Sequence, residues 1–144
     1  MAESIEDKLA RFVAELRRRG YRVTAQRLAI ARIVLSNIKR HPSFMEILEK
    51  VREEVPSVSP STVFTNLQLM EQMGLIRSFN VKGETHYDDA VPHFNVYCLD
   101  TGEVVDVEDL EALEAVRKTL LKVAKVEPYN IVVYGRCGGA SGPG

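Results

Sequence analysis

Apolar residues recur at the spacing of amphipathic helices in four successive stretches of the first half of the chain. These stretches cover about residues 4–19, 25–38, 43–55 and 60–73. Thr24 precedes the second stretch, and Ser43 with Glu46 forms a capping-box pattern at the third. Ser59 and Pro60 are placed as the capping residue and first residue of the fourth. The pattern therefore predicts four helices joined by short turns.

A change of pattern follows the fourth stretch and predicts a β-hairpin. The segments LIRSFNV (75–81) and ETHYD (84–88) flank the two-residue turn Lys82-Gly83. Helix, turn, helix and hairpin in this order are typical of a winged helix-turn-helix. In that fold the second helix of the turn enters the DNA major groove, with its N-terminal side chains at the base edges.

The outer face of the fourth stretch has the side chains that such a reading helix needs. It presents uncharged hydrogen-bonding groups, where a merely solvated helix would usually have Lys and Glu. Short hydroxyls and amides can bond bases or phosphates, an aromatic ring can pack on a thymine methyl, and nearby arginines can contact phosphates. The predicted DNA-binding residues are Arg22, Arg27, Ser59, Ser61, Thr62, Phe64, Thr65 and Asn66. The alternative is a winged-helix surface that serves protein contacts only.

The second half of the chain predicts a small α+β unit. Strands are expected at 94–99 and 103–107, a helix at 109–124, and a strand at 129–135 that is apolar on both faces and therefore buried. The inward residues of the helix would be Leu110, Leu113, Val116, Leu120 and Ala124. A unit of this size is too small to be comfortably stable alone. We therefore expect a homodimer, which would present two reading helices to palindromic double-stranded DNA.

The predicted fold class is α+β, with a winged-helix domain over residues 1–88, a dimerisation domain over 89–136 and a flexible tail over 137–144. Charge supports two modules, since residues 1–78 hold 13 Lys and Arg against 9 Asp and Glu, whereas residues 79–144 hold 6 against 11. No apolar run is long enough for a membrane span, and the acidic start MAESIEDKLARF is not typical of a secretory signal. We expect a cytoplasmic protein with neither a membrane nor a small-molecule substrate as partner.

Five motifs, in order over about residues 20–140, resemble those of one known family. They are GYRVTAQRLAI, HPSFMEI, VSPSTVFTNLQLMEQMGLI, PHFNVYCLDTGEVVD and VVYGRCGGA. On these residues the chain resembles the ferric uptake regulator (Fur) family. The resemblance implies a dimeric, metal-responsive repressor with a winged helix and an α+β dimerisation domain. Phe64 and Thr65 depart from the Tyr and the frequent Arg of the family, which leaves the operator sequence open.

Carried over residue by residue, the resemblance implies a regulatory divalent metal bound between the two domains. The implied ligands are His41, Asp88, His93, Asn95 and Asp106. Two His and two carboxylates suit Fe, Mn or Zn. Asn95 stands where the family has a second His of a His-x-His motif, and its neutral carbonyl oxygen should lower the affinity. Asp rather than Glu at position 106 is similar to the family's peroxide-sensing branch, in which the positions of His41 and His93 are oxidised.

The two cysteines, Cys98 and Cys137, are too few for the family's structural zinc site, which uses two Cys-x-x-Cys pairs. The resemblance implies that they are neighbours, and three states stay open: buried free thiols, a disulfide, or partners in a mixed site. The alternative function is accordingly a DNA-binding regulator that responds to redox through this pair, or to no effector. We expect no enzyme activity, because the motifs H-E-x-x-H, G-x-S-x-G and the P-loop do not occur.

Overall fold

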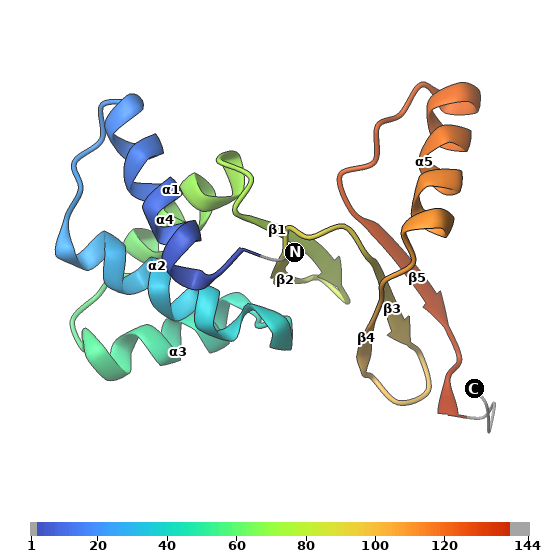
Figure 1. The fold of residues 1–144 in the computed structure, drawn as a ribbon. Coiled ribbons are helices and arrows are strands. Elements are labelled where there is room, and N and C mark those ends of the chain that lie inside the picture. Colours follow the sequence, from blue (N-terminus) through green and yellow to red (C-terminus); the bar gives the residue numbers. More distant parts are fainter. Residues whose placement is uncertain (1–2, 139–144) are drawn as a thin grey trace. The chain divides into compact units, whose positions relative to one another are not determined.

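The chain divides into two compact units, residues 1–90 and 91–144, and the computed structural model describes residues 3–138 of it. The first unit consists of helices and a two-stranded hairpin, and the second of a three-stranded sheet and one helix (Figure 1). This arrangement confirms the predicted fold class, an N-terminal winged helix-turn-helix followed by a small α+β unit. Across residues 3–138, no helix combines the length and the apolar character needed to cross a membrane.

The helices of the first unit surround one apolar core. They are α1 (Ile5–Arg18), α2 (Ala25–Asn37), the short 3-10 helix η1 (Ile38–Arg40), α3 (Phe44–Glu54) and α4 (Pro60–Gln72). Fully buried side chains from all four α-helices meet there, among them Phe12, Ile30, Val51, Val63 and Met70. Burial of each such side chain contributes on the order of 2 kcal/mol relative to leaving it in water. The core therefore holds α4 in a defined position against α2.

Side-chain caps begin these helices where the sequence predicts them. Thr24 Oγ1 accepts a backbone N–H in the first turn of α2 at 3.1 Å, and Ser59 Oγ does the same for α4 at 3.2 Å. At α3 the capping box is complete, because Ser43 and Glu46 each accept the other's backbone N–H with a side-chain oxygen. Each cap satisfies a donor that the helix itself leaves unpaired, so these local signals set the helix starts.

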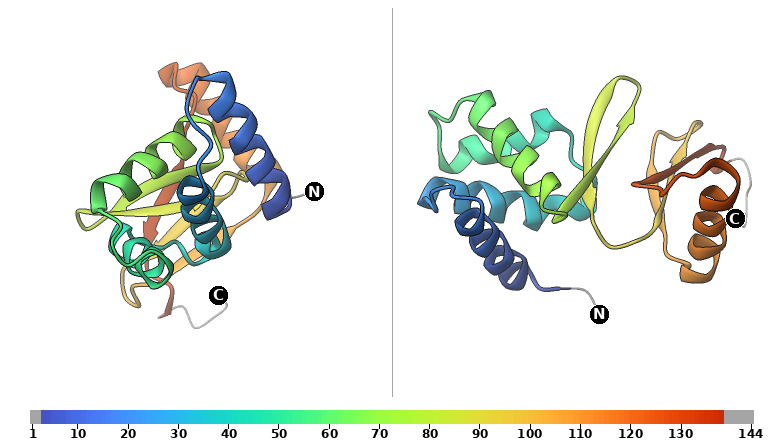
Figure 2. Two further views of the ribbon diagram at one scale, coloured as in Figure 1. Left: turned by 90° about the vertical axis from the view of Figure 1, so that its left-hand side faces the viewer. Right: turned by 90° about the horizontal axis from the view of Figure 1, so that it is seen from above.

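Strands β1 (Ile76–Val81) and β2 (Glu84–Asp89) form the predicted hairpin, which extends as a ribbon beside the helices of the first unit (Figure 2). The two strands pair antiparallel in one continuous register. Lys82 and Gly83 have φ angles of 52° and 80°, and a two-residue hairpin turn of type I′ requires positive values at both positions. The hairpin is the wing of the winged helix.

The last residue of the hairpin, Asp89, is bound to the helices by two lysines. Its carboxylate lies 3.3 Å from Nζ of Lys8 in α1 and 2.8 Å from Nζ of Lys39 in η1. Lys8 and Asp89 are both buried, and a buried charge is stable only when it is paired. This ion pair holds the end of β2, which includes Asp88, against the helices.

The second unit is built on a sheet in the order β4-β3-β5. Its elements are β3 (Phe94–Cys98), β4 (Val104–Val107), α5 (Leu110–Ala124) and β5 (Ile131–Gly135). Strand β3 is central, and it pairs antiparallel with β4 and parallel with β5. The helix α5 connects the two edge strands along the chain.

One expectation for this unit is wrong, and a second holds only in part. Strand β5, expected to be buried, lies at the edge of the sheet, and its residues Val133 and Tyr134 are 45% and 53% exposed. Helix α5 has no fully buried side chain along Leu110–Ala124. Of the residues expected to face inward, Leu113, Val116 and Leu120 are half-buried, whereas Ala124 is exposed and Leu110 is 71% exposed. An apolar pattern shows which side chains avoid water, but it does not show whether the same chain covers them.

A disulfide joins Cys98, the last residue of β3, to Cys137 beyond the end of β5. Beside it, the carboxylate of Asp100 accepts the backbone N–H groups of Cys137 and Gly138 at 2.9 and 2.8 Å. Of the three states that the sequence left open, the structure has the disulfide, so neither sulfur is a thiolate. The predicted flexible tail begins with these two anchored residues, and its remainder, residues 139–144, lies outside the described residues.

Candidate metal centre and nucleic-acid interface

His41 is positioned by the edge of the wing. It follows η1 in the left-handed conformation, with φ of 51°, and leads into Pro42. Strand β2 holds this segment, because Tyr87 N–H donates to the Pro42 carbonyl at 2.9 Å and His86 Nδ1 donates to the His41 carbonyl at 2.7 Å. The His41 ring packs edge-on against Phe79 with the ring centroids 5.9 Å apart. The imidazole is therefore buried and held beside β2.

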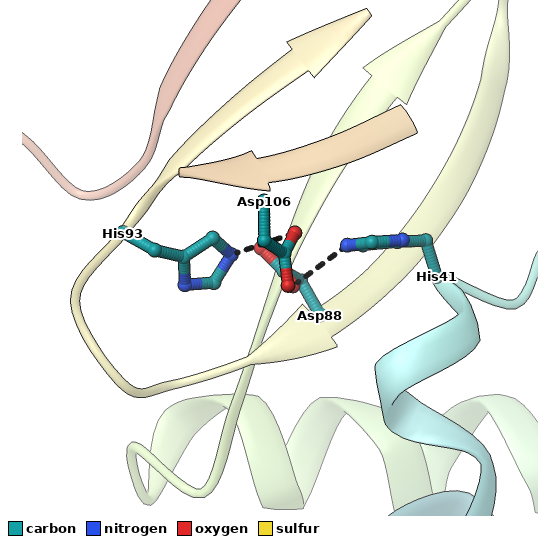
Figure 3. Close-up of side chains that lie close together, drawn as sticks. All are labelled: His41, Asp88, His93 and Asp106. Atoms are coloured by element: carbon teal, nitrogen blue, oxygen red, sulfur yellow. Dashed lines mark ion pairs between the residues drawn. The ribbon is translucent and has the colours of Figure 1, made fainter. Parts of the chain in front are cut away.

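The partner of His41 in the first unit is Asp88. Nε2 of His41 lies 3.6 Å from Oδ1 of Asp88, and Figure 3 marks this ion pair. Asp88 is only 1% exposed, and the same oxygen accepts the backbone N–H of Asp89 at 2.9 Å. A buried imidazole and carboxylate in contact offer one nitrogen and up to two oxygens to a cation. The first unit thus holds one His–carboxylate pair at the end of the wing.

The second unit holds a corresponding pair, His93 and Asp106. Nδ1 of His93 contacts the Val91 carbonyl, which can only accept, so Nδ1 carries the donated proton. In the neutral ring, the lone pair is then on Nε2, and Nε2 lies 3.6 Å from Oδ1 of Asp106 (Figure 3). A backbone carbonyl that orients the other ring nitrogen in this way is the usual support of a metal-binding histidine.

Asn95 contacts the same ring nitrogen. Its Oδ1 lies 3.2 Å from Nε2 of His93, and the residue is fully buried in β3. Its Nδ2 donates to Oδ1 of Asn130 at 3.1 Å. Three potential ligand atoms of the second unit, from His93, Asn95 and Asp106, therefore lie close together. The chemistry of this donor set fits a divalent cation, since one ion would satisfy the lone pairs of both Nε2 and Oδ1.

A further residue of this neighbourhood, Asn130, was missed by the sequence prediction. It precedes β5 and belongs to none of the motifs that indicate the ligands. The third histidine, His86, is a support rather than a ligand: Nδ1 bonds the His41 carbonyl, and Nε2 lies 3.1 Å from a Glu84 carboxylate oxygen.

All the predicted DNA-binding residues except Ser59 and Phe64 line a cleft of about 380 Å³ in the first unit, where α2 and α4 begin. Its lining consists of Arg22, Thr24, Gln26, Arg27, Ser61, Thr62, Thr65 and Asn66. Arg27 is oriented by its hydrogen bond to the Arg22 carbonyl at 2.6 Å and by the Tyr21 ring, whose centroid is 5.5 Å away. Two helix N-termini and two arginines make this surface suitable for phosphate groups.

Individual candidates differ in what they present. Ser61 and Thr65 are exposed, and Phe64 is 47% exposed with its ring edge-on to Phe44. Ser59 serves as the cap of α4, so its hydroxyl already accepts a backbone N–H.

Asn66 is the exception, because it is only 2% exposed and donates to the Arg27 carbonyl at 3.4 Å. It packs α4 on α2, and the expectation that it reads bases is corrected accordingly. Thr24 and Gln26 line the cleft although the sequence prediction did not include them.

A winged helix joined to an α+β unit, with a His–carboxylate pair in each unit, defines the class of metal-responsive DNA-binding regulators. The family follows from comparison with known proteins: the sequence pattern of the Ferric uptake regulator family matches residues 18–134, and the chain belongs to this family. The resemblance inferred from the five motifs is thereby confirmed. Members of the family are transcription regulators, which also confirms the prediction that the protein is not an enzyme.

Individual relatives agree with this assignment. A ferric uptake regulation protein homolog of Archaeoglobus fulgidus is 33% identical over 117 residues, which cover 81% of this chain and 90% of the relative. The peroxide-responsive repressor PerR of Staphylococcus aureus is 28% identical over 139 residues, covering 94% and 93%. Among solved structures, a ferric uptake regulator from Pseudomonas aeruginosa with manganese matches with a TM-score of 0.69 at 28% identity, covering 86% of this chain and 96% of that one.

Proposed function

We propose that the protein is a homodimeric, sequence-specific transcription repressor whose DNA affinity is controlled by one divalent metal ion, Fe, Mn or Zn, per chain. The observation that supports this most strongly is that each unit has its own His–carboxylate pair, in which His41, Asp88 and His93 are buried and Asp106 is half-buried. One pair belongs to the DNA-reading unit and the other to the sheet. The proposed ligands are His41, Asp88, His93, Asn95 and Asp106, and the proposed place of action is the cytoplasm.

Metal control follows from the distribution of these ligands along the chain. Neither His–carboxylate pair alone fills the coordination sphere of a divalent transition metal, which takes four to six ligands. An ion that takes ligands from both units restricts how they move relative to each other. It thereby shifts the population toward the arrangement with which a dimer can place two reading helices on DNA. Asp106 and the similarity to the S. aureus peroxide-responsive repressor favour a peroxide-sensitive form of this control.

DNA recognition is assigned to the exposed side of α4. Ser61, Thr62, Phe64 and Thr65 would face base edges, while Arg22 and Arg27 at the cleft would contact phosphates. A dimer of such units would read a palindromic site. The uncharged hydroxyls suit this role because they can donate or accept, and so adapt to different base edges.

Dimerisation is supported by an uncovered apolar face of the second unit. The strand register places Val105, Val96 and Val133 in one row across the sheet, and Val107, Phe94 and Ile131 in the next. All six side chains are exposed or half-buried. The helix of this unit also has no fully buried side chain. We therefore expect a second copy of the chain to cover the two apolar rows.

The dimer can be tested at the centre of this face. Val133→Asp places a charge in the proposed interface and is expected to convert the protein to a monomer at low micromolar concentration, as measured by light scattering after size exclusion. Met45→Asp, at an exposed apolar residue of the first unit, is the control and should leave the mass unchanged. A Val133→Asp protein that keeps both its fold, by circular dichroism, and a dimeric mass would contradict the proposed interface.

The DNA-binding function can be tested by selecting duplexes from a random pool in the presence of Mn²⁺. Fluorescence anisotropy with the enriched duplex should show binding at least about tenfold weaker after chelation of the metal, in line with an allosteric coupling of 1–3 kcal/mol. Thr65→Glu should also weaken binding at least tenfold at unchanged Mn²⁺ affinity, because the carboxylate is repelled by phosphates. Thr119→Glu, the same change at an exposed threonine of α5, should have little effect. Failure of the selection with Mn²⁺ to enrich any duplex would refute the proposal.

The disulfide supports a second candidate, a regulator that responds to redox through Cys98 and Cys137. The same anisotropy assay separates the two. Metal control predicts loss of binding with a chelator and retention with dithiothreitol, whereas redox control predicts the reverse.

A further inference from the structure

We propose that Asn130 is a positioning residue that fixes the amide of Asn95 with its oxygen toward His93, and that this oxygen makes the metal centre favour Mn²⁺ relative to Zn²⁺. The inference rests on the proposed metal site, but it uses only contacts within the second unit. Neither the family resemblance nor the motifs assign a role to Asn130.

The orientation of the Asn95 amide follows from its two contacts. Nδ2 donates to Asn130 Oδ1 at 3.1 Å, which leaves Oδ1 on the side of His93 Nε2, 3.2 Å away. Asn95 is fully buried and lies on central strand β3, so backbone pairing on both sides holds it in place. If the Asn95 amide were turned by 180°, its N–H₂ would donate to His93 Nε2. The lone pair of Nε2 would then be occupied and could not bind a metal. In the structure Asn130 offers Oδ1 to this amide, and the contact favours the end of the Asn95 amide that reaches the site.

The choice of oxygen has a consequence for the metal. Imidazole suits Zn²⁺ and Fe²⁺, whereas carbonyl and carboxylate oxygens suit Mn²⁺. With Asn95, the proposed ligands are two imidazole nitrogens, two carboxylates and one amide oxygen. With a histidine at this position, as in the His-x-His motif of the family, a third nitrogen would replace the amide oxygen. The Asn95 oxygen therefore reduces the advantage of Zn²⁺, provided that Asn130 holds it in place.

The register of the sheet explains how a distant residue acquires this role. Strand β5 pairs in parallel with β3, and Asn95 is opposite Val132, two residues after Asn130. The start of β5 is therefore next to the part of β3 that holds the ligand. Asn130 lies 35 residues from Asn95 in sequence, and the pairing of β5 with β3 brings the two together.

The test is a metal titration of the full-length protein, with Mn²⁺ followed by electron paramagnetic resonance of the free ion and Zn²⁺ by competition with a chromophoric chelator. Asn130→Ala is expected to weaken Mn²⁺ binding about tenfold or more, the usual range for a residue that orients a ligand. Asn130→Asp retains the acceptor for Asn95 Nδ2 and should keep the selectivity of the wild type, since its added charge favours both cations. Asn95→His should raise the Zn²⁺ to Mn²⁺ affinity ratio at least tenfold.

A double-mutant cycle shows whether Asn130 acts through Asn95. In an Asn95→Ala background, Asn130→Ala should cause no further loss of Mn²⁺ affinity, because the amide that it orients is gone. Additive losses would overturn the inference, as would an Asn130→Asp protein that has lost Mn²⁺ binding, since the acceptor role would then be wrong. If the wild type binds neither ion, the proposed metal site itself fails. If it binds and Asn130→Ala binds equally well, only the present inference fails.

Discussion

His93→Ala is expected to weaken Mn²⁺ or Zn²⁺ binding at least about 100-fold and to abolish the metal dependence of DNA binding. Outer residues that merely orient a ligand already contribute 10–100-fold to metal affinity, so loss of a ligand itself should exceed that range. His93 is one of two nitrogen ligands proposed, and its Nε2 contacts both Asn95 and Asp106. Its removal leaves those oxygens without the nitrogen that makes the second unit bind a transition metal. Titration of purified protein, with elemental analysis of bound metal, measures the effect.

Two further variants make this experiment specific. His86→Asn is the matched control, because the amide N–H₂ can still donate to the His41 carbonyl and no proposed ligand is lost; it should bind metal nearly as well as the wild type. His41→Ala tests whether one ion takes ligands from both units, and should lose affinity as His93→Ala does. Wild-type affinity in His41→Ala, combined with loss in His93→Ala, would mean that the second unit binds the ion alone. If His41→Ala and His93→Ala both bind metal with the stoichiometry and affinity of the wild type, the proposed metal site is refuted.

Removal of the disulfide is expected to cause a large loss in the free energy of unfolding. The Cys98→Ser, Cys137→Ser double variant should lose about 4 kcal/mol of unfolding free energy, since a cross-link that closes a loop of this length restricts the unfolded chain by about that amount. The bond spans 39 residues and joins the central strand β3 to Cys137, just beyond the end of β5. Denaturant titration followed by circular dichroism, at one fixed protein concentration because of the proposed dimer, measures the change.

Reductant provides the control for this prediction. Dithiothreitol should lower the midpoint of the wild type toward that of the double variant and should leave the double variant unchanged. A wild-type midpoint that does not respond to dithiothreitol, with reduced thiols verified by alkylation, would show that the bond contributes little. The hydrogen bonds of the Asp100 carboxylate to Cys137 and Gly138 remain in the variant, so complete release of the segment is not expected.

Much of the fold was predictable because its signals are local. Capping requires a side chain within three residues of the backbone N–H that it satisfies, so Thr24, Ser43 and Ser59 indicated three helix starts correctly. The Lys82-Gly83 turn likewise marked the hairpin, since its positive φ angles and the hydrogen bond from Gly83 N–H to Asn80 Oδ1 involve only residues close to each other in sequence. His41, Asp88, His93 and Asp106 were named from motif resemblance, and each shares a contact with another of them in its own unit.

The tertiary structure decided what depends on residues far apart in the sequence. Asn66 and Ser61 look alike as polar residues of one helix, yet packing on α2 buries Asn66 and leaves Ser61 exposed. Sheet order places β5 at an edge, although its sequence is apolar on both faces. The pairing of Cys98 with Cys137, and of Asn95 with Asn130, follows from the alignment of β5 beside β3. A sequence pattern records the preference of each side chain for water or for the interior, whereas its partner is set by how separate segments meet in space.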